Sequence, residues 1–180
     1  MEDIIFKRRS IRLFKKQEIP EEILRKILLA GMWAPSPKNR QPWKIIAVLG
    51  KSKETMLPLM KEGIDRSERG EGIITGSKEY IANARYTMKC MAAAPVTVFI
   101  THPGGKSLRE DWSAAENMAL IAAEMGIGSL WNGNIFFAYD ELKNWLDAGE
   151  MVLAMSFGYP AHHPSPLNRK KEEDVIEIRR

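Results

Sequence analysis

Three short runs of apolar and β-branched residues constrain the fold of this chain most strongly. They are residues 44–49 (KIIAVL), 95–101 (PVTVFIT) and 151–157 (MVLAMSF). Runs of this length that lie beside glycine or proline indicate buried strands. Residues 126–134 (GIGSLWNGN) predict a further short strand between two turns, because glycines flank its apolar centre.

The segments between these strands have helical spacing, with apolar residues at every third or fourth position. We predict helices over residues 19–34, 52–60, 79–93, 112–125 and 140–146, and we expect Asp140 to cap the last of them. Residues 62–77 are charged and glycine-rich without clear periodicity, which predicts a mobile loop or lid. Because helices and strands do not alternate strictly, a mixed α+β sheet is favoured over a doubly wound parallel sheet.

The chain has 180 residues, of which 44% are hydrophobic, and this is enough for a packed core. We therefore predict a single domain over residues 1–180. Residues 161–180 are polar and proline-rich, and their only apolar cluster is residues 175–178 (VIEI). We expect this C-terminal extension to pack on a partner subunit.

The single cysteine, Cys90, excludes an intrachain disulfide framework and fits a reducing compartment. Its methionine and alanine neighbours predict a buried structural thiol. The apolar stretch 92–100 is far shorter than the roughly 20 residues that a membrane span needs, so we expect a soluble cytoplasmic protein. His162 and His163 do not predict a metal site, because adjacent side chains rarely point to one centre.

The positive charge is concentrated near the N-terminus. The net charge is +4, yet residues 7–16 alone carry six cations and no acid. Three readings fit this basic segment: a solvated arm, a nucleic-acid surface, or a socket for one phosphate group. A hydroxyl at Ser10 among arginines is typical of phosphate binding, whereas the segment shows no aromatic interleaving suited to base stacking. We expect no nucleic-acid partner.

Residues 34–43 (APSPKNRQPW) form the most informative segment of the chain. Three prolines restrict its backbone, and Ser36, Asn39 and Gln41 offer side-chain donors and acceptors. Such a stiff polar loop after a helix suits a polyhydroxylated or heteroaromatic ligand. A purely structural turn has the same composition, so the residues alone leave both readings open.

Residues 8–12 (RRSIR), 34–43 and 126–134, in this order and at these separations, resemble the FMN-dependent nitroreductase family. The resemblance runs from about residue 4 to residue 169. It implies a nitroreductase-like fold, with a mixed and mostly antiparallel central sheet flanked by helices. It also implies a homodimer that binds FMN at the subunit interface, with each C-terminal extension wrapped around the partner.

The resemblance also assigns roles to individual residues. Arg8 and Ser10, with Arg9 beside them, match phosphate contacts of the family, and so does Arg169 in the tail. Arg12 matches the cation that faces the N1/O2 edge of the flavin, where reduced flavin is negatively charged. The family often has a basic residue two positions before Arg169, but this chain has Leu167 there.

Two further segments are carried over from the family. The backbone of Trp131, Asn132 and Gly133 matches the segment that approaches flavin N5, and a glycine permits that close approach. The residues of the stiff loop match contacts to the flavin ring and ribityl chain; they are Pro35, Ser36, Pro37, Asn39 and Gln41.

The resemblance predicts a flavoprotein oxidoreductase. NADH or NADPH would deliver hydride to FMN, and a small acceptor such as a nitroaromatic or a quinone would then be reduced at the same place. This ping-pong scheme needs no dedicated acid, base or nucleophile, and we expect protons to come from solvent. Two alternatives stay open: a flavin carrier of the same fold without turnover, and the reductive dehalogenase or dehydrogenase chemistry of related proteins.

Overall fold

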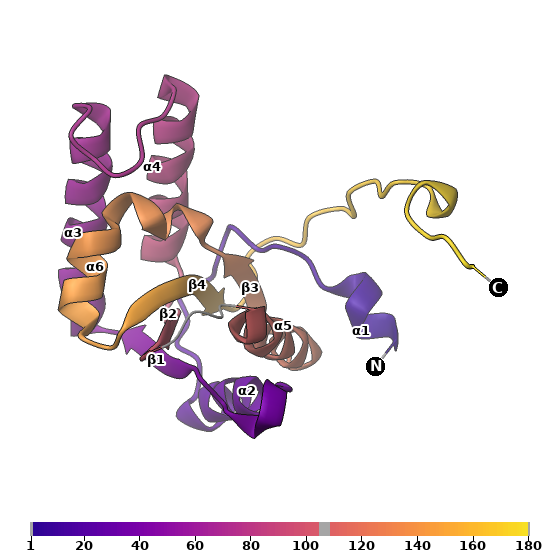
Figure 1. The fold of residues 1–180 in the computed structure, drawn as a ribbon. Coiled ribbons are helices and arrows are strands. Elements are labelled where there is room, and N and C mark those ends of the chain that lie inside the picture. Colours follow the sequence, from indigo (N-terminus) through magenta and orange to yellow (C-terminus); the bar gives the residue numbers. More distant parts are fainter. Residues whose placement is uncertain (1, 105–108, 180) are drawn as a thin grey trace.

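A four-stranded antiparallel sheet forms the centre of the fold (Figure 1), in the strand order β1-β2-β4-β3. The structure is a computed structural model, and it describes residues 2–104 and 109–179. The strands are β1 (Lys44–Leu49), β2 (Val96–His102), β3 (Gly128–Trp131) and β4 (Glu150–Gly158). All the strand pairs are antiparallel, and the parallel component is one bridge between Ser10 and Ser129. The mostly antiparallel sheet and the four predicted strands are confirmed.

Helices cover both faces of this sheet (Figure 1). One face packs on α2 (Glu21–Met32) and α5 (Arg109–Glu124). The other packs on α3 (Lys51–Glu68), α4 (Lys78–Ala93), α6 (Tyr139–Leu146) and the 3₁₀ helix η2 (Gly133–Ala138). The central strand β2 is buried on both faces: Val98 and Ile100 enter the first core, and Phe99 enters the second. This explains why its sequence is continuously apolar.

The prediction for residues 62–77 is wrong in its first part. Helix α3 continues to Glu68, and only residues 69–77 connect it to α4. The glycine that weakened the helical pattern, Gly63, has a packing function, since a Cβ there would lie 2.4 Å from Ala138 Cα. The predicted cap is also wrong: α6 begins at Tyr139 after Ala138, without a side-chain cap, and Asp140 lies within its first turn.

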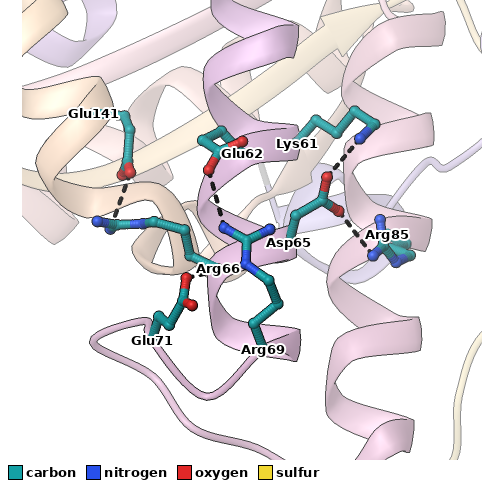
Figure 2. A network of polar contacts seen from close by, with 8 residues as sticks. All are labelled: Lys61, Glu62, Asp65, Arg66, Arg69, Glu71, Arg85 and Glu141. Atoms are coloured by element: carbon teal, nitrogen blue, oxygen red, sulfur yellow. Dashed lines mark hydrogen bonds and ion pairs between the residues drawn. The ribbon is translucent and has the colours of Figure 1, made fainter.

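A network of ion pairs joins the helices on the α3 side of the sheet (Figure 2). Asp65 of α3 accepts hydrogen bonds from Lys61 on the same helix and, at 2.9 Å, pairs with Arg85 of α4. Arg66 pairs with Glu141 of α6 at 2.9 Å. Arg69 pairs with Glu62 and Glu71 and so ties the start of the connecting segment to α3.

The basic N-terminal segment is anchored to the domain. It follows a short helix that the sequence did not predict, α1 (Glu2–Lys7), and Ile11 and Phe14 are buried. The Ile11 N–H donates to the Ser129 carbonyl at 2.9 Å, and the Ala161 N–H donates to the Leu13 carbonyl at 2.9 Å. The segment therefore lies beside β3 and next to the start of the C-terminal extension.

The C-terminal extension leaves the body of the domain and runs out beside α1 (Figure 1). Over residues 161–179 its one regular element is η3 (Glu172–Asp174). The apolar cluster predicted to pack on a partner is exposed in the single chain: Val175 is 66% and Ile178 78% exposed. In the described part of the chain, no helix has the length and apolar character of a membrane span.

Candidate functional site

The N-terminal segment and the C-terminal extension together line a cavity of about 440 Å³. Five of the predicted phosphate-site and ring-edge residues meet there: Arg8, Arg9, Ser10, Arg12 and Arg169. Leu167 lines the cavity too, at the position where the family often has a cation. Four guanidinium groups on one cavity form a donor set suited to a phosphate dianion, because each can present paired N–H donors to its oxygens.

Arg8 and Arg9 differ in how much of their hydrogen-bonding capacity is used. Arg9 donates from Nη1 to the carbonyls of Phe6 and Arg8, at 2.5 and 2.8 Å, and thereby closes the end of α1. Arg8 is largely buried, with Nε 3.8 Å from Glu116 Oε1. Its Nη1 is buried without a hydrogen-bond partner among the described residues. A buried charged donor left unpaired costs more than about 1–3 kcal/mol, so Arg8 favours an anion in this cavity.

A second cavity, of about 210 Å³, shares Arg12 with the first. Two further predicted residues, Trp131 and Gly133, line it. The Trp131 ring also packs against Trp112 of α5, with ring centroids 5.6 Å apart. Arg12 is exposed and lies where the two cavities meet, which suits a cation that faces one edge of an extended ligand.

Sequence reasoning missed the part of the second cavity that α4 contributes. Asn83, Tyr86, Thr87 and Cys90 line it, and their i, i+3, i+4 and i+7 spacing puts them on one helix face. Their polar character at this spacing is visible in the sequence, but it was not separated from the general helical pattern of residues 79–93. Asn134, the last residue of the segment 126–134, also lines this cavity, and the family resemblance assigns it no role.

Asn132 lies in the core and lines neither of these cavities. Its side chain is 1% exposed and donates from Nδ2 to Ser156 Oγ at 2.9 Å. Its backbone N–H donates to the Ala154 carbonyl at 2.8 Å, so that amide is already used by the sheet. Gly133, in contrast, is exposed and is the first residue of η2, where amides have no partner within the helix.

The stiff loop between α2 and β1 is held by its own side chains. Ser36 Oγ accepts the Gln41 N–H at 2.9 Å, and Gln41 Nε2 donates to Asn39 Oδ1 at 3.1 Å. Lys38, Asn39 and Gln41 have φ between 45° and 57°, a conformation that is costly for residues with a side chain. Such local strain is typical of functional loops.

Within one chain this loop does not join the arginines. The cavity that gathers Arg8 and Arg169 includes none of the predicted loop residues, which are Pro35, Ser36, Pro37, Asn39 and Gln41. The loop contains η1 (Pro37–Asn39) and lies between α2 and β1, which is one edge strand of the sheet. The N-terminal arginines lie beside β3, the edge strand at the opposite end of the sheet.

The thiol of Cys90 is a buried group, as predicted, with 3% of its surface exposed. Burial raises its pKa, so the thiol stays protonated at neutral pH and is a poor nucleophile. Among the described residues, no group of three or more histidine, cysteine, aspartate or glutamate side chains is placed to hold a metal ion.

The sequence pattern of the Nitroreductase family matches residues 5–159. The chain belongs to this family. It is 32% identical over 181 residues to a protein of Archaeoglobus fulgidus provisionally named NADH dehydrogenase/NAD(P)H nitroreductase, covering 97% of this chain and 88% of that protein. It is 28% identical to the iodotyrosine deiodinase of Thermotoga neapolitana, covering 94% and 93% of the two chains.

The fold is also that of solved nitroreductases. The FMN-dependent nitroreductase NfnB from Mycobacterium smegmatis, solved in complex with NADPH, superposes with a TM-score of 0.78 over 99% of this chain and 97% of that chain. The sequence identity between the two is 20%, so this likeness concerns the arrangement of the elements. It agrees with the antiparallel sheet and the helical layers described above.

Proposed function

We propose that this Nitroreductase family chain is an FMN-dependent oxidoreductase. When bound, FMN would accept hydride from NADH or NADPH and pass reducing equivalents to a small acceptor such as a nitroaromatic or a quinone. The observation that carries the proposal is the arginine-lined cavity: Arg8 lines it, and the Nη1 of this arginine is buried without a partner among the described residues. A phosphate bound beside Arg8 would supply the acceptor that this donor lacks.

The residues of the chain divide the work of binding between two ends of the cofactor. Arg8, Ser10 and Arg169 would hold the phosphate in the larger cavity. Arg12, which lines both cavities, would face the flavin ring edge that becomes negative on reduction. Trp131 and the peptide at Gly133 would lie against the ring in the smaller cavity.

The proposal assigns no side chain to proton transfer. None of the described residues that line the two cavities is an aspartate, a glutamate or a histidine. Protons would therefore come from solvent, and the reaction rate should vary little between pH 6 and 8. A steep titration that disappears on substitution of one cavity residue would contradict this part of the proposal.

We also propose that the working unit is a homodimer. Two observations support it: the apolar residues of the extension, such as Ile176 and Ile178, are exposed, and the stiff loop does not reach the arginine cavity of its own chain. A partner chain would cover the exposed apolar residues of the extension, and its own stiff loop would reach the arginine cavity. The single cysteine, Cys90, fits a cytoplasmic location.

Purification of the protein with and without added FMN tests the function directly. We expect yellow protein whose flavin absorbance is bleached by NADH or NADPH and restored by a nitroaromatic or a quinone. Colour without bleaching would support the flavin-carrier alternative. Protein that takes up no FMN would contradict both.

A second reaction is favoured by one comparison, the similarity to a deiodinase over nearly the whole chain. The same FMN-loaded protein, reduced under anaerobic conditions, should then release iodide from iodotyrosine. Iodide release faster than nitroaromatic reduction would favour reductive dehalogenation as the main activity. An acceptor screen that includes both substrates decides between them.

A further inference from the structure

Gly133 lies between two asparagines that are tied to different elements. Asn132 donates from Nδ2 to Ser156 Oγ on β4 at 2.9 Å, and this pair is buried. Asn134 donates from Nδ2 to Thr87 Oγ1 on α4 at 2.7 Å, and this pair is partly buried. The backbone between β3 and η2 is therefore held on both sides of Gly133.

Gly133 itself contributes little to its own placement. It is exposed, and a Cβ built on it would meet no atom within 4 Å. A glycine also has more backbone freedom than any other residue, so the orientation of its peptide depends on its neighbours. Another contact between η2 and α4 is the ring pair of Phe137 and Tyr80, whose centroids are 5.8 Å apart.

The two anchors are not equivalent. Asn132 belongs to the core, and loss of its side chain would remove the buried hydrogen bond to Ser156. The bond between Asn134 and Thr87 lies on the wall of the smaller cavity, beside the amides at the start of η2. It connects the α4 wall of the cavity to the start of η2, and it is only partly buried, unlike the bond of Asn132.

We infer that Thr87 and Asn134 form a positioning pair that fixes the orientation of the Gly133 peptide toward the cavity shared by Arg12 and Trp131. The inference rests on the proposed function, because the ligand that this peptide would meet is the flavin ring. Neither residue needs to touch the reacting atoms. Their bond keeps the peptide in one orientation, so hydride transfer would depend on it more than cofactor affinity does.

The first test uses the flavin-free protein and follows hydrogen–deuterium exchange of the peptide that covers residues 131–136. Thr87→Val removes the acceptor and keeps the side-chain shape, and Asn134→Ala removes the donor. Each should raise amide exchange in this peptide by about threefold or more, since the loss of one hydrogen bond changes the opening equilibrium by that order. Thr87→Ser keeps the hydroxyl and should exchange as the wild type does, as should Thr55→Val, a matched change at an exposed position of α3.

The second test uses the FMN-loaded protein and single-turnover reduction by NADPH. Both variants should reduce flavin about three- to tenfold more slowly, while the Kd for FMN changes by less than about twofold. The double variant should be no slower than either single variant, because both remove one and the same bond. Thr87→Ser should restore the wild-type rate.

Three results would overturn the inference: unchanged exchange in both variants, additive losses in the double variant, or an FMN Kd that rises in parallel with the loss of rate. The last would mean that the pair supports the whole cavity and not the peptide. A wild-type chain that binds no FMN would contradict the proposed function instead, and the exchange experiment on flavin-free protein would still decide whether the pair holds Gly133.

Discussion

At the scale of single residues, neighbouring arginines with the same chemistry perform different tasks. Arg9 is occupied by the carbonyls at the end of α1, whereas Arg8 has a buried donor without a partner among the described residues. Composition alone ranks the two equally. Which of them meets an anion is decided by the direction of the backbone at the end of α1, and the short helix was not predictable from six residues.

Arg8→Ala should weaken FMN binding by about 1.5–3 kcal/mol, the usual contribution of a charged hydrogen bond, which is roughly 10- to 150-fold in Kd. A fluorescence titration of FMN into the flavin-free protein measures it. Arg25→Ala, at an exposed position of α2, is the matched control and should change the Kd by less than about twofold. Equal affinities for wild type and Arg8→Ala would mean that the phosphate lies elsewhere.

The fold of the single chain does not require a glycine at position 133. Its φ lies outside the left-handed region, and a Cβ there would touch nothing within 4 Å. Gly133→Ala should therefore keep or raise the free energy of unfolding, by up to about 1 kcal/mol. FMN affinity should fall about tenfold, because the methyl group would occupy space that the flavin ring needs. Thermal unfolding and FMN titration of the same sample separate the two effects, and unchanged affinity would place the ring away from this peptide.

At the scale of elements, α3 and α4 are joined by the carboxylate of Asp65. The hydrogen bond from Lys61, and after it the one from Arg85, lower the pKa of Asp65 below its ordinary value. A lowered pKa stabilises the folded state above the unfolded pKa of about 4, and this stabilisation is lost as the pH falls through the folded value. The pairing of α3 with α4 should thus weaken only in acid.

Asp65→Asn should lower the free energy of unfolding by about 1 kcal/mol at pH 7. The size of the effect follows from the position of the carboxylate, which is partly shielded from water. The difference from wild type should shrink as the pH falls from about 4 through the lowered folded pKa, because the folded carboxyl takes up a proton there. Urea denaturation at pH 7 and at pH 3 measures both values. Asp147→Asn, at an exposed helix end, should show no such difference, and a gap for Asp65→Asn that persists at pH 3 would contradict the assignment.

The elements that the sequence predicted best are those whose pattern has one cause. The strands β2 and β4 were recognisable because burial on both faces leaves a continuous apolar run. The end of α3 was not recognisable, because a glycine such as Gly63 usually weakens a helix. Here Gly63 makes room for Ala138, and no local pattern contains this contact, which spans 75 residues of sequence.

The candidate site divides in the same way. Arg8, Arg9 and Arg12 are close together in the sequence, so their clustering was predictable from composition. Arg169 lies far along the chain, and only the family resemblance placed it with them. The assignment of Asn132 could not be refined, because its side chain is held by Ser156 of β4, 24 residues further along the chain, and no local pattern contains that contact. The wall from α4 was missed because its polar residues share a helix with apolar core residues.

At the scale of the whole molecule, the predicted site residues form two groups. Arg8 and Arg169 share one cavity, whereas the loop with Ser36 and Asn39 lies outside it. Both groups are polar, and the strained backbone of the loop lines no part of the arginine cavity of its own chain. If one FMN needs both groups, each site of a twofold dimer takes the arginines from one chain and the loop from the other.

Subunit complementation tests this arrangement. One chain carries Arg8→Ala with Arg12→Ala, the other Ser36→Ala with Asn39→Ala, and each homodimer should retain little FMN. Two different affinity tags isolate the mixed dimer. In a shared-site dimer one of its two sites combines both defects and the other is intact, so it should hold about half the flavin per chain of the wild type. Sites built within single chains would leave a defect in each, and the mixed dimer would then hold as little flavin as either parent.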